Sequence, residues 1–149
     1  MCIRDRNHLV EIIRKLKRPY VRYTRADEKN VRKADCLIID CFGLLSSIYR
    51  YGEIAYIGGG FGVGIHNTLE AAVYGIPVIF GPKYQKFQEA IQLLEAKGAF
   101  SVKDYEELKT LLDRMLTDEV FLRESGMNAS NYVTGNAGAT DKIMSMINF

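Results

Sequence analysis

The stretch IAYIGGGFGVGIHNTLEAAVYGIPVIFGP, residues 54–82, decides the fold of this chain. Apolar residues 54–57 predict a strand, and five of the next seven residues are glycine. From Asn67 the apolar residues recur at helical spacing until Gly75 and Pro77 end the run, and residues 78–80 begin a second strand. A strand, a glycine loop, a helix and a strand in this order predict a parallel α/β sheet.

The glycine loop, residues 58–64, is typical of a phosphate-binding turn. Glycine lets the backbone approach a ligand closely, and a helix start beyond it offers unpaired N–H groups to an anion. A tight turn between strand and helix requires glycine as well, so both explanations stay open. If the ligand is the reason, Gly60→Val should abolish donor binding and change the thermal midpoint by only a few degrees.

The two common nucleotide motifs do not fit this loop. The dinucleotide fingerprint G-x-G-x-x-G fails because Val63 or Asn67 stands at its last glycine. The P-loop fails because Ile65 replaces the lysine.

The helix start at residues 67–70 has two interpretations that do not exclude each other. Asn67 and Glu70 have the spacing of a capping box, in which both side chains satisfy backbone N–H groups. Alternatively, the Glu70 carboxylate faces the same cleft as the glycines and accepts both hydroxyls of a ribose.

Length and composition indicate one soluble globular domain. The chain has 149 residues, 48% of them hydrophobic and 26% charged. No apolar run approaches the roughly 18 residues of a membrane span, and residues 1–6 do not resemble a signal peptide. Cys2, Cys36 and Cys41 lack the paired spacing of a zinc site and are interpreted as reduced thiols, which predicts a cytoplasmic location.

Charge is unevenly distributed along the chain. Residues 1–33 carry a net charge of +7 and residues 34–149 carry −5. The basic helix near residues 11–18 either forms a solvated face or lies near an anionic lipid surface. Because its basic residues are not interleaved with aromatic ones, we expect no nucleic-acid partner.

The order of elements along the chain is regular. We expect helices at residues 7–16, 44–51, 68–74, 86–97, 105–116, 119–133 and 137–147, and strands at 20–23, 36–39, 54–57, 78–80 and 99–102. This alternation predicts a Rossmann-like parallel sheet flanked by helices. Ligands of such sheets lie beyond the carboxyl ends of the strands, where residues 40–44 and 58–70 fall.

The blocks DCFGL (40–44), IAYIGGGF (54–61), GIHNTLEAA (64–72) and GIPVIFGP (75–82), with Phe87, resemble 3-deoxy-D-manno-octulosonic acid (Kdo) transferases. The resemblance runs from about residue 7 to the end and is close to the form found in the Bacteroides group. It implies the C-terminal half of a GT-B glycosyltransferase, an inverting, metal-independent enzyme that moves Kdo from CMP-Kdo to the lipid A precursor, lipid IVA, at the cytoplasmic face of the inner membrane.

The resemblance also implies that donor binding and catalysis belong to different domains. Residues 1–149 would form one CMP-Kdo binding domain that is truncated at its N-terminus. The catalytic base, the lipid acceptor and the peripheral membrane contact would belong to an absent N-terminal domain, so that this chain holds no catalytic residue, metal or cofactor and is inactive alone. The implied donor-binding residues are Phe42, Gly43, Leu44, Gly59, Gly60, His66, Asn67, Thr68, Leu69 and Glu70.

Three features depart from the family pattern. Residues 1–6 match neither the strand nor the Pro-Arg or Pro-His element expected there, Leu44 stands where many relatives have glutamate, and Thr68 stands where many have proline. A nucleotide-sugar binding module or an epimerase-type GT-B relative without lipid transfer is the alternative function, and an α/β interaction domain without a ligand is a third.

Overall fold

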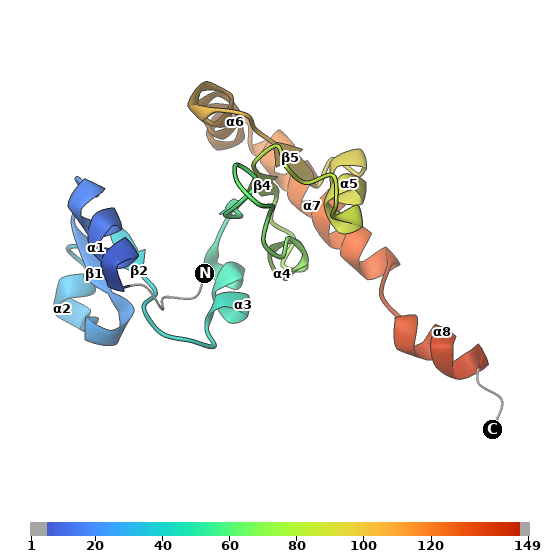
Figure 1. The fold of residues 1–149 in the computed structure, drawn as a ribbon, viewed down its shortest axis with the longest axis horizontal. Helices are drawn as coiled ribbons and strands as arrows, with labels where there is room; N and C mark the ends of the chain where they lie inside the picture. The colour runs from blue at the N-terminus through green and yellow to red at the C-terminus, as the bar shows by residue number, and fades with distance from the viewer. Residues whose placement is uncertain (1–5, 147–149) are drawn as a thin grey trace. The chain divides into compact units, whose positions relative to one another are not determined.

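The computed structural model describes the backbone of residues 6–146 and the side chains of residues 10–138 and 143–146. The chain divides into two compact units, unit 1 (Met1–Ser47) and unit 2 (Ile48–Phe149). Each unit is built on strands that pair in parallel, and Figure 1 labels most of the helices and strands of both. The prediction that the whole chain acts as a single donor-binding domain stays a prediction.

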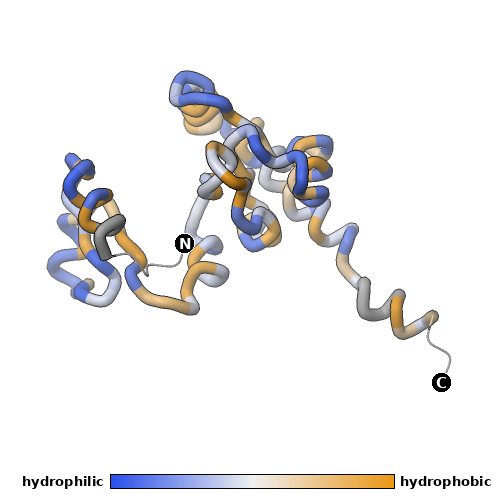
Figure 2. The backbone as a smooth tube through the Cα atoms, in the orientation of Figure 1, coloured by the Kyte–Doolittle hydropathy of each residue, from blue (hydrophilic) through white to orange (hydrophobic). Residues whose placement is uncertain are grey.

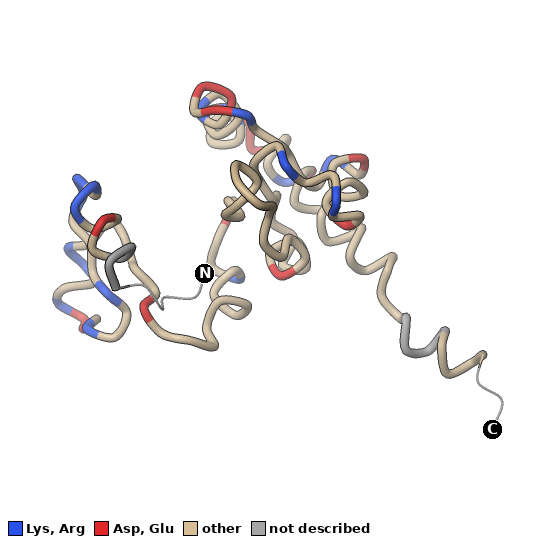
Figure 3. Tube along the Cα trace, in the orientation of Figure 1, with Lys and Arg blue, Asp and Glu red and all other residues tan. Residues whose placement is uncertain are grey.

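Unit 1 contains a two-stranded parallel sheet with helices. Strand β1 pairs with β2 so that Val21, the buried residue of β1, lies opposite Leu37. Lysine and arginine are concentrated in this unit, as Figure 3 shows. The elements are α1 (Arg6–Lys15), β1 (Tyr20–Arg22), η1 (Tyr23–Arg25), α2 (Glu28–Val31), β2 (Cys36–Ile38) and α3 (Leu45–Ile48), whose last residue already belongs to unit 2.

Unit 2 contains a three-stranded parallel sheet in the order β3-β4-β5. The central strand is fully buried on both faces, because Val78, Ile79 and Phe80 are each 0% exposed. Its elements are η2 (Tyr49–Tyr51), β3 (Ala55–Tyr56), α4 (Leu69–Ala72), β4 (Val78–Phe80), α5 (Gln88–Glu95), β5 (Ala99–Ser101), α6 (Tyr105–Thr117), α7 (Glu119–Gly135) and α8 (Ala139–Met146).

The two faces of this sheet are covered by different helices. On one face Val78 and Phe80 join a core cluster with Leu93 of α5. On the other face Ile79 packs with Met115 of α6. Alternate residues of a strand point to opposite faces, so α5 and α6 lie on opposite sides of the sheet. Both helices combine hydrophilic and hydrophobic residues, as expected for helices with one buried side (Figure 2).

Helix α7 approaches the rest of unit 2 through small residues. A Cβ atom on Gly98 would lie 2.6 Å from the Cα atom of Ala129 in α7. A Cβ atom on Gly126 of α7 would collide with the carbonyl oxygen of Gly75. The helix therefore contacts its neighbours backbone to backbone, and larger side chains at these positions would push it outward.

The predicted order of strands and helices is confirmed, with differences in length and grouping. The helix expected at residues 68–74 is shorter, because Tyr74 and Gly75 donate to Ala71 and Ala72 in i→i−3 bonds, and Gly75 adopts a φ of 71°. The helix expected at 44–51 is divided into α3 and the 3₁₀ turn η2, and the strands form two sheets rather than one. Helix α2, capped by Asp27, was not predicted, and residue 147 lies outside the described residues.

Candidate functional site

The glycine loop after β3 is a narrow hairpin that closes on itself. Gly59 and Ile65 form an antiparallel bridge. The N–H of Gly60 donates to the carbonyl of Gly64 at 2.7 Å, and the N–H of His66 donates to the carbonyl of Gly58 at 3.1 Å. Much of the loop's backbone hydrogen bonding is therefore satisfied within the loop itself.

Close packing within the protein explains three of the loop's glycines. Gly60 has a φ of 80°, and a Cβ atom there would lie 2.7 Å from the Cα atom of Gly81. Gly59 has a φ of 92°, and its Cβ atom would collide with the carbonyl oxygen of Gly64. A Cβ atom on Gly64 would lie 2.9 Å from the ring of Phe87. These contacts favour the tight-turn explanation for glycine here, whereas donor binding by Gly59 and Gly60 stays a prediction.

Asn67 and Glu70 are joined, but not as a capping box. The Asn67 side-chain oxygen accepts from the N–H of Leu69 at 3.0 Å, and its Nδ2 donates to Oε1 of Glu70 at 3.0 Å. Glu70 is therefore oriented by a side chain rather than by the backbone N–H of residue 67. Helix α4 has only four residues, so it contributes little of the dipole expected at a helix start.

Tyr49 lies beside this pair and was not singled out from the sequence. It packs against the core next to α4, and burial followed by the nearby charge of Glu70 raises the pKa of its hydroxyl. The sequence carried no local signal for this contact, because 21 residues separate the two positions. The structure thus places a carboxylate, an amide and a phenol together at one side of unit 2.

The remaining predicted residues of this segment differ in exposure. His66, Asn67 and Leu69 are exposed, which leaves them available to a ligand. Thr68 is only 1% exposed, and its Oγ1 atom is buried without a hydrogen-bond partner among the described residues. A buried polar atom of this kind usually bonds to water or to a ligand.

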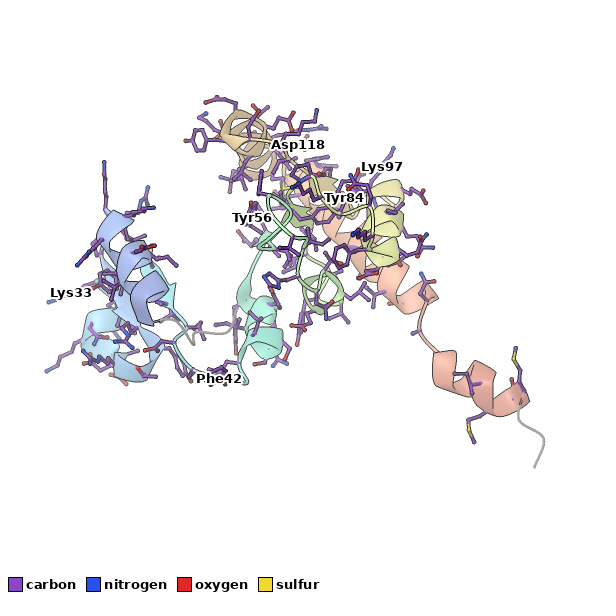
Figure 4. The ribbon with its side chains drawn as sticks, in the orientation of Figure 1. Lys33, Phe42, Tyr56, Tyr84, Lys97 and Asp118 are labelled. Carbon is purple, nitrogen blue, oxygen red and sulfur yellow. The ribbon has the colours of Figure 1, made fainter. Side chains whose placement is uncertain are left out.

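The turn at residues 42–44 belongs to unit 1. Phe42 is 74% exposed at its tip, labelled in Figure 4. Gly43 has a φ of 84° with open space around it, so this glycine is required by the backbone conformation alone. Leu44 is half-buried, and its carbonyl accepts from the hydroxyl of Ser47. That one donor contacts both this turn and residues 66–70 stays a prediction.

Asp40 fixes the beginning of that turn. Its Oδ1 accepts from the backbone N–H of Thr24 at 3.0 Å, and its Oδ2 accepts from the Thr24 hydroxyl and from Nε of Arg22, each at 2.7 Å. The bonds from Thr24, with a smaller contribution from Arg22, lower the pKa of Asp40 from 3.8 to about 2. Asp40 is therefore a structural anion with its oxygens already occupied.

The described residues lack a metal cluster and a membrane-spanning helix. In the described part of the chain, no three His, Cys, Asp or Glu side chains gather closely enough to hold a metal ion. None of the helices described is both long and apolar enough to span a membrane.

Comparisons with known proteins point in one direction. The chain is 42% identical over 87 residues to the 3-deoxy-D-manno-octulosonic acid transferase of Aquifex aeolicus, covering 57% of this chain and 25% of that protein. It is 32% identical over 116 residues to that of Rickettsia bellii, covering 76% of this chain and 28% of the relative. The chain thus spans about a quarter of the length of these relatives. No protein-family model matches it.

A solved structure matches the fold. The C-terminal CMP-Kdo binding domain of WaaA from Acinetobacter baumannii superposes with a TM-score of 0.70 at 18% identity, covering 85% of this chain and 67% of that one. The expected fold class, a Rossmann-like α/β domain of the kind that forms the C-terminal half of these transferases, is confirmed. In sequence the chain is a relative of the Kdo transferases, and in fold it is like their C-terminal domain.

Proposed function

We propose that this chain is the donor-binding part of a Kdo transferase and that its ligand is CMP-Kdo. The observation that carries the proposal is the 42% identity over 87 residues to the Aquifex aeolicus transferase. The fold match, to a domain described as CMP-Kdo binding, supports it. Both favour a transferase over a nucleotide-sugar module or an epimerase-type relative.

The arrangement around Glu70 supports a contact with the ribose of CMP. Glu70 is half-buried, and its Oε1 accepts from Asn67. Its Oε2 has no hydrogen-bond partner among the described residues. A carboxylate held in one orientation can accept from two adjacent hydroxyl groups, as a ribose offers them. Asn67 acts here as a positioning residue for Glu70.

Two polar groups near Glu70, one exposed and one buried, suit the rest of the ligand. The exposed imidazole of His66 and the buried, unpaired hydroxyl of Thr68 lie next to Asn67 in the chain and can donate to a phosphate or carboxylate. The glycine loop provides the shape of the site, since its backbone is held against Gly81. Phe42, Gly43 and Leu44, in the turn after β2 of unit 1, stay predicted contacts of the donor.

Binding of CMP to variants of the full-length protein tests this proposal. A hydrogen bond to a charged group contributes about 1.5–3 kcal/mol, so Glu70→Gln should weaken CMP at least tenfold in calorimetry. Asn67→Ala should weaken it less, because Glu70 remains but loses its orientation. Glu95→Gln, an exposed glutamate on α5, is the matched control.

UDP serves as the competing nucleotide in the same experiment. The proposal requires CMP to bind more tightly than UDP. Unchanged CMP affinity in Glu70→Gln would leave Glu70 as a partner of Asn67 only. Equal affinity for both nucleotides would contradict the assignment of a cytidine donor.

The activity of the whole protein extends the proposal. We infer transfer of Kdo to a lipid A precursor, lipid IVA, with inversion and without a metal, at the cytoplasmic face of the inner membrane. A base must lie within hydrogen-bond reach of the acceptor's proton. In this proposal the base and the acceptor surface belong to an N-terminal domain, and residues 1–149 alone bind the donor without transferring it.

A further inference from the structure

A groove of about 610 Å³ runs along the outer edge of β5 in unit 2. Four consecutive residues, 99–102, line it, together with Leu94 of α5, Lys97 just after α5, and five residues of α6: Glu106, Glu107, Thr110, Leu111 and Arg114. Since α5 and α6 cover opposite faces of the sheet, a groove that touches both must lie at its edge. β3, which leads into the glycine loop, forms the other edge, so this groove is separate from the donor site.

The backbone of β5 offers unpaired hydrogen-bonding groups to this groove. Gly98 accepts from Val78, and Val102 donates to Phe80, so both point toward β4. Because the direction alternates along a parallel strand, Ala99 and Ser101 direct their N–H and C=O groups away from the sheet. No strand pairs with this side of β5 in the part of the chain described. An open strand edge of this kind favours the addition of another strand.

The wall formed by α6 carries opposite charges at its two ends. Glu106, Thr110 and Arg114 are spaced by four residues and therefore lie on one side of the helix. Neither Glu106 nor Arg114 has an ion-pair partner among the described residues, although the Arg114 guanidinium lies 3.7 Å from the ring centroid of Phe121. The neighbouring charged residues, in contrast, already have ion-pair partners: Lys103 pairs with Glu107, and Lys109 pairs with Asp113.

We propose that a second copy of this chain occupies the groove, with the two β5 strands pairing antiparallel across a two-fold axis. In this arrangement Ala99 of each copy pairs with Ser101 of the other, which forms four backbone hydrogen bonds. Helix α6 then lies antiparallel to its counterpart, and Glu106 of each copy faces Arg114 of the other. The row formed by Glu106, Thr110 and Arg114, called the helix stripe here, is complementary to itself, as an isologous interface requires.

The strand pairing and the helix pairing require the two-fold axis at the same distance from the loop that joins β5 to α6. Phe100 is the centre of the strand pairing, two residues before Val102, or about 7 Å at the rise of a strand. Thr110 is the centre of the helix stripe, five residues after Tyr105, or about 7.5 Å at the rise of a helix. Because α6 follows β5 after a connection of three residues and packs on a face of the same sheet, we infer that it runs back along β5, so that one axis serves both. The dimer would contain a continuous six-stranded sheet, three strands from each copy.

One pair of like charges limits the strength of this dimer. The same register places Lys97, labelled in Figure 4, opposite Lys103 of the other copy. The ammonium of Lys103 lies 3.5 Å from a carboxylate oxygen of Glu107, which offsets much of the repulsion. We therefore expect a concentration-dependent dimer that salt weakens.

Sedimentation of the 149-residue chain over a concentration series tests the proposal. We expect reversible dimerisation, with Glu106→Arg and Arg114→Glu each raising the dissociation constant at least tenfold, because each creates two like-charge contacts. The double variant Glu106→Arg/Arg114→Glu should dimerise again, and so should a mixture of the two single variants. Glu124→Arg, on the exposed surface of α7, is the control and should leave dimerisation unchanged.

A substitution in β5 tests the contribution of strand pairing to the dimer separately from that of the charges on α6. Ser101→Pro removes an N–H group that faces the groove and leaves the bonds to β4 in place, so it should abolish the dimer while circular dichroism stays unchanged. A chain that remains monomeric throughout the series overturns the proposal, even if an unrelated extended peptide binds the groove. A dimer that survives the single charge reversals, or that the double variant fails to restore, overturns it as well.

Discussion

Replacing Gly60 with valine should destabilise unit 2 strongly. The new Cβ atom would lie 2.7 Å from the Cα atom of Gly81 and 2.8 Å from its carbonyl carbon and oxygen, all of them backbone atoms. The φ of 80° adds strain of about 1–2 kcal/mol for an L-residue. Overpacking of a buried position adds about 1–3 kcal/mol, so we expect a loss of about 2–5 kcal/mol.

Thermal unfolding followed by circular dichroism measures this loss. Each kcal/mol corresponds to about 4–8 °C for a domain of about 100 residues such as unit 2, so the unfolding midpoint of unit 2 should fall by roughly 10 °C or more. Gly62→Ala is the matched control in the same loop, since Gly62 has open space around its Cβ position and no positive φ. Gly43→Ala isolates the contribution of φ, because an alanine at φ 84° is strained while the space around position 43 is open.

The refuting result is a Gly60→Val variant whose midpoint stays within a few degrees of the parent protein. Loss of CMP binding at unchanged stability would then show that the glycine serves the ligand, as the sequence left open. A midpoint lowered equally by Gly62→Ala would show that the loop tolerates no side chain anywhere. Either outcome would contradict the contact between Gly60 and Gly81 as the reason for glycine at position 60.

Three further predictions concern other features. Thr68→Val should raise the free energy of unfolding by about 1 kcal/mol or more in urea titrations, since it removes a buried, unpaired hydroxyl; a decrease would show that Oγ1 has a partner. The folded-state pKa of Asp40 lies below its unfolded value of 3.8, so the unfolded chain binds more protons, and stability should be lost as the pH falls from about 4 to about 2. Asp40→Asn should flatten that dependence. Incubation of the isolated chain with CMP-Kdo and a lipid A precursor, with and without EDTA, should give no product; product would contradict the division between two domains.

The sequence predicted local structure well because the signals were local. The apolar run at residues 78–80 became the central buried strand, and Gly75 ended the helix before it. Asn67 was expected at the helix start, and its side chain does accept from the N–H of Leu69. Each of these features depends on residues within a few positions of one another.

Contacts between distant positions could not be predicted in the same way. Gly60 touches Gly81, 21 residues later, and a glycine pattern does not indicate which backbone comes close. Tyr49 approaches Glu70 through packing of η2 on α4, which leaves no periodic trace in the sequence. The division into two sheets likewise depends on which strands pair, and apolar runs alone do not specify pairing partners.

The hairpin of the glycine loop has a consequence for proteolysis. Its tip carries Phe61, which is 51% exposed, and Val63, which is fully exposed, so a chymotrypsin-like protease should be able to cut the chain after Phe61. Two contacts join the two sides of the hairpin at the base of this tip: the bridge between Gly59 and Ile65 and the hydrogen bond from Gly60 to Gly64. A nicked chain would therefore keep its two new ends paired, and the two fragments should stay together until a denaturant separates them.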